Sequence, residues 1–214
     1  MKDTRATWIV FDVGGVLLDW MSSSDVFAEK LNLTHDELFS ALYDLEVEEN
    51  IGASMNVGKI SGQEGWGALL AKFNKQLPFR DIVAAWTAES FWPKDTLQLI
   101  RDLKAAGYKM AILSNSWFGL TDSATQDLFP DELQLFDIVI DSAVEKMQKP
   151  NPDLYKRFEE RVNAHGADIF FIDDDQKNLT VAEELGWESF LYRMGEAGNE
   201  VVLNNNKLRE LLLS

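Results

Sequence analysis

Apolar and polar positions follow two different patterns along this chain. Short apolar runs rich in β-branched and aromatic residues are separated by longer segments with helical spacing, both at the N-terminus and from residue 93 onward. Strands are predicted at residues 7–13, 109–113, 136–140, 169–172 and 189–192. Helices are predicted at 94–106, 121–129, 152–163, 178–185 and 204–213. Strands that alternate with helices predict an α/β fold with a parallel sheet and helices on both of its faces.

Residues 20–92 differ from the rest, because they show helical periodicity without a clear strand. Two capping boxes mark helix starts, one pairing Thr34 with Glu37 and the other pairing Ser61 with Glu64. A further helix is expected after Pro78. We therefore interpret residues 1–19 and 93–214 as the core and residues 20–92 as a small helical cap inserted after the first strand.

Several side chains of this segment are expected to form its apolar interior. Leu38, Leu42 and Leu45 share one helix face. Trp66, Trp86 and Trp92 are expected in the core of the cap, whereas Trp117 follows the second strand closely enough to face a site there.

The ligand site of an open parallel sheet lies beyond the carboxyl ends of its strands. The residues at those ends are Asp12, Ser114-Asn115, Lys149, and the acids Asp173 and Asp174. An aspartate can act as a nucleophile toward phosphorus, and Mg²⁺ held by these acids would offset the charge of two approaching anions. Lys149 would add a second positive charge, and Ser114 could donate a hydrogen bond to a phosphoryl oxygen. Gly14 and Gly15 would let the backbone pass close to both the metal and the phosphate.

Charge and composition narrow the function classes. The chain has 214 residues, a net charge of −16 and no cysteine. An acidic surface argues against nucleic acid and anionic membranes as partners. No apolar run is long enough to span a bilayer, the N-terminus lacks a signal-peptide pattern, and a cysteine-free chain is compatible with a cytoplasmic location.

Four segments in order, "FDVGGV", "ILSNS", "KPNPDLY" and "FIDDDQKN", resemble the motifs of the haloacid dehalogenase superfamily, and the resemblance spans roughly residues 8–192. It implies a Rossmann-like core, a helical cap and, for most members, a Mg²⁺-dependent phosphatase acting on a small-molecule phosphate ester, with a sugar phosphate as one option. By resemblance, Asp12 is the nucleophile, Ser114 and Asn115 hold the phosphate, and Lys149 neutralises it. The metal would be held by Asp12, the Gly14 carbonyl, Asp174 and, directly or through its neighbours, Asp173. Asn178 would orient those ligands.

Gly14 departs from the family pattern, because most phosphatases of this family carry a second aspartate there. That residue donates a proton to the leaving group, a contribution typically worth about 10²–10⁴-fold. Three alternatives therefore stay open. They are a metal-independent 2-haloacid dehalogenase, a phosphotransferase or mutase, and a catalytically silent binding protein that kept the fold.

Overall fold

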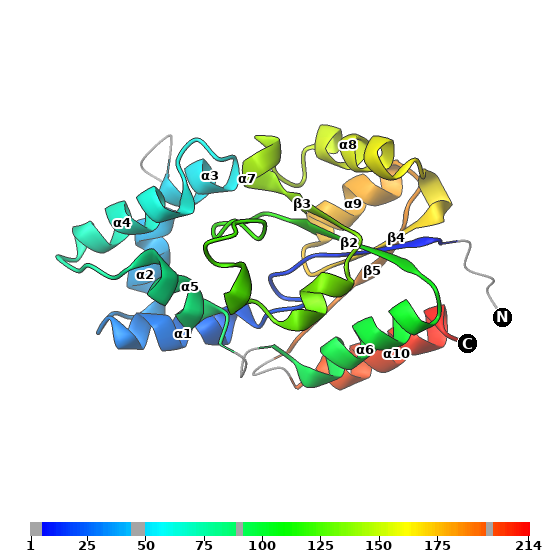
Figure 1. Ribbon diagram of the computed structural model, residues 1–214, viewed down its shortest axis with the longest axis horizontal. Coiled ribbons are helices and arrows are strands. Elements are labelled where there is room, and N and C mark those ends of the chain that lie inside the picture. The colour runs from blue at the N-terminus through cyan, green and yellow to red at the C-terminus, as the bar shows by residue number, and fades with distance from the viewer. Residues whose placement is uncertain (1–5, 44–49, 89–91, 196–198) are drawn as a thin grey trace.

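The computed structural model describes residues 6–43, 50–88, 92–195 and 199–214. Its centre is a sheet of five parallel strands in the order β3-β2-β1-β4-β5 (Figure 1). The strands are β1 (Trp8–Phe11), β2 (Lys109–Ser114), β3 (Ile138–Asp141), β4 (Ile169–Asp173) and β5 (Glu188–Leu191). The prediction of a parallel α/β sheet is confirmed.

Helices cover both faces of this sheet, as Figure 1 shows. On one side lie α6 (Lys94–Ala105) and α10 (Val201–Leu212), and on the other lie α8 (Pro152–Val162) and α9 (Gln176–Glu184). Strand β1 is buried throughout, since Ile9 and Phe11 join the first apolar cluster while Trp8 and Val10 join the second. This two-sided burial explains why the strand is a continuous apolar run rather than an alternating one.

The helix predicted at residues 121–129 is wrong. This stretch contains only the 3₁₀ helix η2 (Gln126–Leu128), and η3 (Asp131–Leu135) follows it. The Asp122 carboxylate accepts a hydrogen bond from the Ala124 amide at 2.8 Å, and such local bonds compete with helix formation. The predicted strand start at Phe136 is also wrong, because Phe136 is the C-cap of η3 and β3 begins at Ile138. Two further short elements are α7 (Ser142–Glu145) and η4 (Gly166–Asp168).

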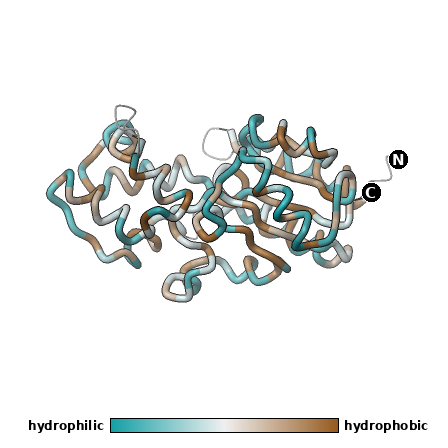
Figure 2. The backbone as a smooth tube through the Cα atoms, turned by 90° about the horizontal axis from the view of Figure 1, so that it is seen from above, coloured by the Kyte–Doolittle hydropathy of each residue, from teal (hydrophilic) through white to brown (hydrophobic). Residues whose placement is uncertain are grey.

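Five helices form a separate lobe at one end of the molecule (Figures 1 and 2). They are α1 (Trp20–Lys30), α2 (His35–Leu42), α3 (Ile51–Asn56), α4 (Gly62–Lys72) and α5 (Phe79–Trp86). We call these helices the helical insertion. Both predicted capping boxes are present, at the starts of α2 and α4. The predicted extension of α2 through Leu45 falls on residues 44–49, which lie outside the described residues.

The helical insertion has its own apolar cluster, which includes Phe27, Leu38, Trp66 and Trp86. The expectation for Trp92 is wrong, because this side chain packs in the cluster of the sheet, where its Nε1 donates to the Thr87 carbonyl at 3.1 Å. The exact division of the chain into core and cap stays a prediction.

Polar contacts of Arg80 and Lys146 tie the helical insertion to the rest of the chain. Arg80 pairs with Asp127 through both terminal guanidinium nitrogens and donates to the Ala124 carbonyl at 3.0 Å, and Lys146 Nζ donates to the Gly58 carbonyl at 2.7 Å. These contacts hold α5 and the α3–α4 connection against the core.

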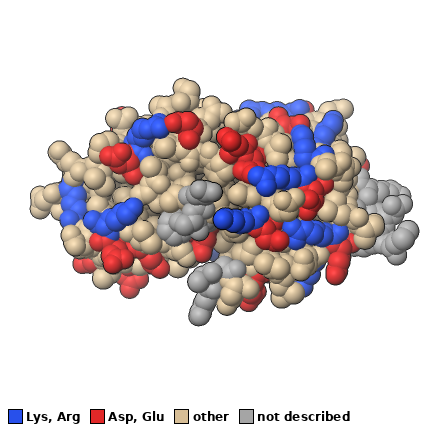
Figure 3. All heavy atoms as spheres, turned by 60° about the horizontal axis from the view of Figure 1, so that its bottom comes forward, with Lys and Arg blue, Asp and Glu red and all other residues tan. Residues whose placement is uncertain are grey.

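The charged side chains on the surface do not indicate a particular partner. On the face drawn in Figure 3, Lys and Arg side chains lie interspersed with Asp and Glu. No helix in the described segments is both long and apolar enough to cross a membrane. The expectation that the chain binds neither nucleic acid nor membranes stays a prediction from its charge.

Candidate active site

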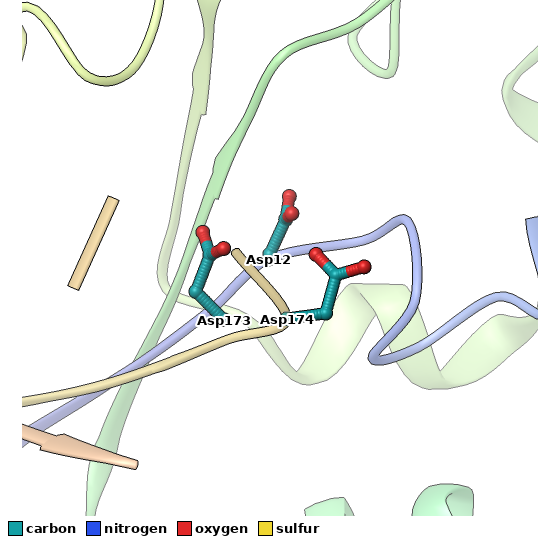
Figure 4. Close-up of side chains that lie close together, drawn as sticks. All are labelled: Asp12, Asp173 and Asp174. Carbon is teal, nitrogen blue, oxygen red and sulfur yellow. The ribbon is translucent and has the colours of Figure 1, made fainter. Parts of the chain in front are cut away.

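Three aspartates converge where β1 and β4 end. Asp12 follows β1 directly, Asp173 is the last residue of β4, and Asp174 comes next. Phe11 pairs with Ile172 across these neighbouring strands, so both strands end at the same level. The three carboxylates each place an oxygen within 4.8 Å of the others, and Figure 4 shows them around a common space.

Lys149 lies among these acids and is almost completely buried. Its Nζ is 2.9 Å from Asp12 Oδ1 and 2.7 Å from Asp173 Oδ2, and its side chain is 1% exposed. Asn115 fixes the backbone of this lysine, because its Nδ2 donates to the Lys149 carbonyl at 3.1 Å and its Oδ1 accepts from the Lys149 amide at 2.9 Å. Asn115, from the predicted motif "ILSNS", therefore positions Lys149, from the predicted motif "KPNPDLY".

Asp173 is held by several donors besides the lysine. Asn178 Nδ2 lies 3.0 and 3.1 Å from its two carboxylate oxygens, and the Asp175 amide donates to Oδ1 at 2.8 Å. Tyr155 in turn donates to the Asn178 carbonyl at 3.0 Å. Asp175 serves as the N-cap of α9. Asn178 thus orients Asp173, and its predicted role toward a metal stays a prediction.

The charges of the cluster are unbalanced. Burial raises the pKa of Asp12 to about 7, with Lys149 acting against the rise and Asp173 and Asp174 adding to it. Burial and the neighbouring Asp173 likewise raise the pKa of Asp174 to about 6. Burial works against the charged form of Lys149, yet the two carboxylates outweigh it and raise the pKa of the ammonium. Three acids facing one lysine leave an excess of negative charge that a divalent cation would offset.

The residues present fit a hard divalent cation. Carboxylate oxygens are among the ligands that Mg²⁺ prefers, and Asp12, Asp173 and Asp174 each supply one within 4.8 Å of the others. Gly15 lets the Asp174 carboxylate lie close to the loop after β1, since its φ is +73° and a Cβ there would lie 2.1 Å from Asp174 Oδ2.

Gly14 is a glycine for a different reason. Its φ lies outside the left-handed region, but a Cβ built on it would be 3.3 Å from Cδ1 of Trp20, the first residue of α1. The indole of Trp20 therefore lies beside the position where relatives with two aspartates carry the second one.

Ser114 ends β2 and is buried beside this cluster. Its hydroxyl lies 3.5 Å from the Asn115 carbonyl, at the outer limit of a hydrogen bond. The hydroxyl can therefore still donate to a ligand. By contrast, the amide of Asn115 is bonded to the Lys149 backbone at both ends.

An aromatic chamber opens from the acids toward the helical insertion. It is a cavity of about 460 Å³ whose wall includes Asp12, Gly14, Ser114 and Asp174 at one end. The aromatic side chains in its wall are Trp20, Phe39, Tyr43, Trp86, Trp117, Phe118 and Phe129. Of these, only Trp117 was expected to face the site. No sequence signal marked Phe39 or Tyr43, and Trp86 was expected only as core.

The chain matches the haloacid dehalogenase-like hydrolases over residues 7–186, and it belongs to this family of hydrolases. This finding confirms the family that the four motifs indicated.

Curated proteins with different names are similar to this chain, and they match different fractions of it. A sesquiterpene phosphatase of Aspergillus oryzae is 26% identical over 83% of this chain and 85% of its own length. Mouse acyl-CoA dehydrogenase family member 10 is 26% identical over 83% of this chain, and rat bifunctional epoxide hydrolase 2 is 33% identical over 45% of it. The matched regions span only 17% and 18% of these last two proteins.

Solved structures share the fold over nearly the whole chain. A haloacid dehalogenase family enzyme from Bacteroides thetaiotaomicron, crystallised as a magnesium complex, is 25% identical with a TM-score of 0.64, covering 92% of this chain and 98% of that one. The L-2-haloacid dehalogenase of Xanthobacter autotrophicus is 20% identical with a TM-score of 0.58, covering 86% of this chain and 76% of its own. The second likeness shows the fold alone.

Proposed function

We propose that the protein is a Mg²⁺-dependent phosphatase that hydrolyses a small-molecule phosphomonoester through an aspartyl-phosphate on Asp12. The observation that carries the proposal is the position of Asp12, 2.9 Å from the Lys149 ammonium and in one carboxylate cluster with Asp173 and Asp174. Attack on an anionic phosphate needs such compensating charge around the nucleophile, whereas attack on the carbon of a haloacid needs no metal site. The Aspergillus phosphatase and the Bacteroides magnesium complex support the same assignment.

The metal would be held by Asp12, Asp174 and the Gly14 carbonyl, with Asp173 beside them. When bound, Mg²⁺ supplies the positive charge that lets a phosphate approach these carboxylates. The ionised form of Asp12, which its burial disfavours, is the form that both metal binding and nucleophilic attack require.

Two displacement steps account for the reaction. An Asp12 carboxylate oxygen attacks phosphorus, the bond between phosphorus and the ester oxygen breaks, and the departing alkoxide takes up a proton from solvent water. A second water then attacks phosphorus and gives up a proton to solvent, the bond to Asp12 breaks, and inorganic phosphate leaves. Lys149 Nζ, which contacts Asp12, and the Ser114 hydroxyl would donate hydrogen bonds to phosphoryl oxygens in both steps. Asn115 acts as a positioning residue, because it holds the Lys149 backbone rather than the phosphate.

The test is phosphate release from p-nitrophenyl phosphate with Mg²⁺ and with EDTA. We expect turnover only with Mg²⁺, and background turnover for Asp12→Asn with an unchanged circular dichroism spectrum. Full turnover in EDTA would contradict the metal requirement, and Asp12-dependent chloride release from 2-chloropropionate would instead establish the dehalogenase alternative. Magnesium binding without turnover of any ester would favour the silent binding protein.

A further inference from the structure

The aromatic chamber is continuous with the proposed phosphate site. One end of its wall contains Asp12 and Asp174, and the other end is built from rings of the helical insertion and of the segment after β2. The rings contact one another, with centroids 5.4 Å apart for Trp20 and Phe39 and 5.8 Å apart for Tyr43 and Trp117. A volume of about 460 Å³ lies within the range of small-molecule sites, roughly 300–1,000 Å³. A phosphate at the acids would therefore place its organic group among these rings.

The chamber offers few groups to a polar or charged ligand, although the buried indole N–H of Trp86 in its wall has no hydrogen-bond partner among the described residues. The described residues in its wall include no Lys, Arg or His. Two of its polar side chains already bond within the protein. The Thr87 hydroxyl donates to the Val83 carbonyl at 2.8 Å, and Ser116 Oγ accepts from the amides of Phe118 and Gly119. Sugar hydroxyls would lose their bonds to water there, and a second phosphate or a carboxylate would find no cation.

We propose that this site selects phosphomonoesters whose organic group is uncharged and apolar, either a ring or a branched or extended hydrocarbon, over sugar phosphates and nucleotides. This inference rests on the proposed phosphatase function and adds its substrate class. Apolar atoms of the ester would replace water against the rings, while the single phosphate stays with Lys149, Ser114 and the metal ligands.

The test compares esters whose leaving groups are all primary alcohols, so that polarity varies more than leaving-group basicity. Octyl phosphate and 2-phenylethyl phosphate form the apolar pair, and glycerol 3-phosphate and glucose 6-phosphate form the polar pair. We expect kcat/KM for the apolar pair to exceed that of the polar pair on the order of a hundredfold, because a few methylene groups in an apolar pocket give such discrimination.

Phe39→Ala tests the wall of the chamber. Phe39 is half-buried on α2, so its truncation leaves the buried tryptophans of the helical insertion in place. We expect the ratio of kcat/KM between octyl phosphate and glycerol 3-phosphate to fall about tenfold, with most of the change in KM for octyl phosphate. The matched control is Phe73→Ala, since Phe73 packs on the same apolar cluster without lining the chamber, and it should keep the wild-type ratio.

A binding measurement separates this inference from the phosphatase proposal. p-Nitrobenzyl alcohol, a quencher of indole fluorescence, should quench the tryptophan emission saturably in wild type and much more weakly in Phe39→Ala. If no ester is hydrolysed yet quenching saturates and depends on Phe39, the phosphatase proposal fails while apolar occupancy of the chamber is supported. Equal or faster hydrolysis of glucose 6-phosphate, or quenching that is linear and independent of Phe39, would overturn the inference while leaving phosphatase function intact.

Discussion

The indole of Trp20 lies so close to Gly14 that a Cβ on Gly14 would come within 3.3 Å of Trp20 Cδ1. That separation is shorter than the about 3.5–4.0 Å of an ordinary carbon–carbon contact. The backbone of Gly14 itself would accept a side chain, unlike that of Gly15 with its φ of +73°. A side chain at position 14 would therefore need the ring of Trp20 to shift by a few tenths of an ångström, whereas the loop itself would not have to change.

This relationship predicts how the missing proton donor can be restored. Gly14→Asp alone should gain little, because its carboxyl competes with Trp20 for space. Gly14→Asp combined with Trp20→Ala should raise kcat for alkyl phosphates, whose leaving groups need a proton, within the limit of about 10²–10⁴-fold for general acid catalysis. The measurement is a series of esters of graded leaving-group pKa, run on wild type, both single variants and the double variant. A wild-type rate that does not depend on leaving-group pKa would mean that another group supplies the proton.

Gly15→Ala should remove the metal site while leaving the fold intact. The new methyl group would occupy the position of the Asp174 carboxylate. The alanine would also have to adopt the left-handed backbone conformation that Gly15 has. We expect Mg²⁺ affinity to fall by at least about 10–100-fold, as judged by the Mg²⁺-induced rise in Tm. Gly67→Ala is the control, since a Cβ there meets nothing within 4 Å and the residue lies inside α4. It should leave Mg²⁺ binding unchanged and stabilise the protein by up to about 1 kcal/mol.

The strand ends and helix starts around this site could be predicted, because they depend on short segments of sequence. Apolar runs that end in Asp12, Ser114 and Asp173 identified the strand ends, and a parallel sheet brings such ends to one edge. The capping boxes at Thr34 and Ser61 likewise marked true helix starts. These features depend on residues that are close in sequence.

The remainder depends on contacts between distant segments. The bonds between the Asn115 side chain and the Lys149 backbone join residues 34 positions apart, so the sequence could not reveal that Asn115 positions this lysine. The rings of Phe39, Trp86 and Trp117 come from separate segments and meet only when the helical insertion packs beside β2. Helical periodicity shows that such residues are inward-facing but not which cavity they border.

Lys149→Met should damage both turnover and stability. It keeps an unbranched side chain only one atom shorter and removes the charge that lies between Asp12 and Asp173. We expect kcat to fall about 10²–10³-fold and the free energy of unfolding to fall by about 3–5 kcal/mol in EDTA, because two buried carboxylates lose their cation. Lys156→Met is the control, since Lys156 forms an exposed pair with Asp153 on α8, and it should change stability by no more than about 0.5 kcal/mol. A small stability loss for Lys149→Met, equal to that of the control, would contradict the view that the lysine balances the acids.

The stability of the metal-free protein should depend on pH through Asp12. Its pKa is raised from 3.8 to about 7 in the folded protein, so between these values the folded state binds a proton that the unfolded state has lost. Stability is therefore unaffected below about pH 4, falls as the pH rises toward 7, and reaches its full loss above that. We expect the free energy of urea unfolding in EDTA to drop between pH 5 and pH 8 by a few kcal/mol more in wild type than in Asp12→Asn, whose side chain cannot ionise. Saturating Mg²⁺ should remove or reverse this difference, because the cation favours ionised Asp12 and Asp174. Identical pH dependence of wild type and Asp12→Asn in EDTA would show that Asp12 is already ionised in the folded protein without metal.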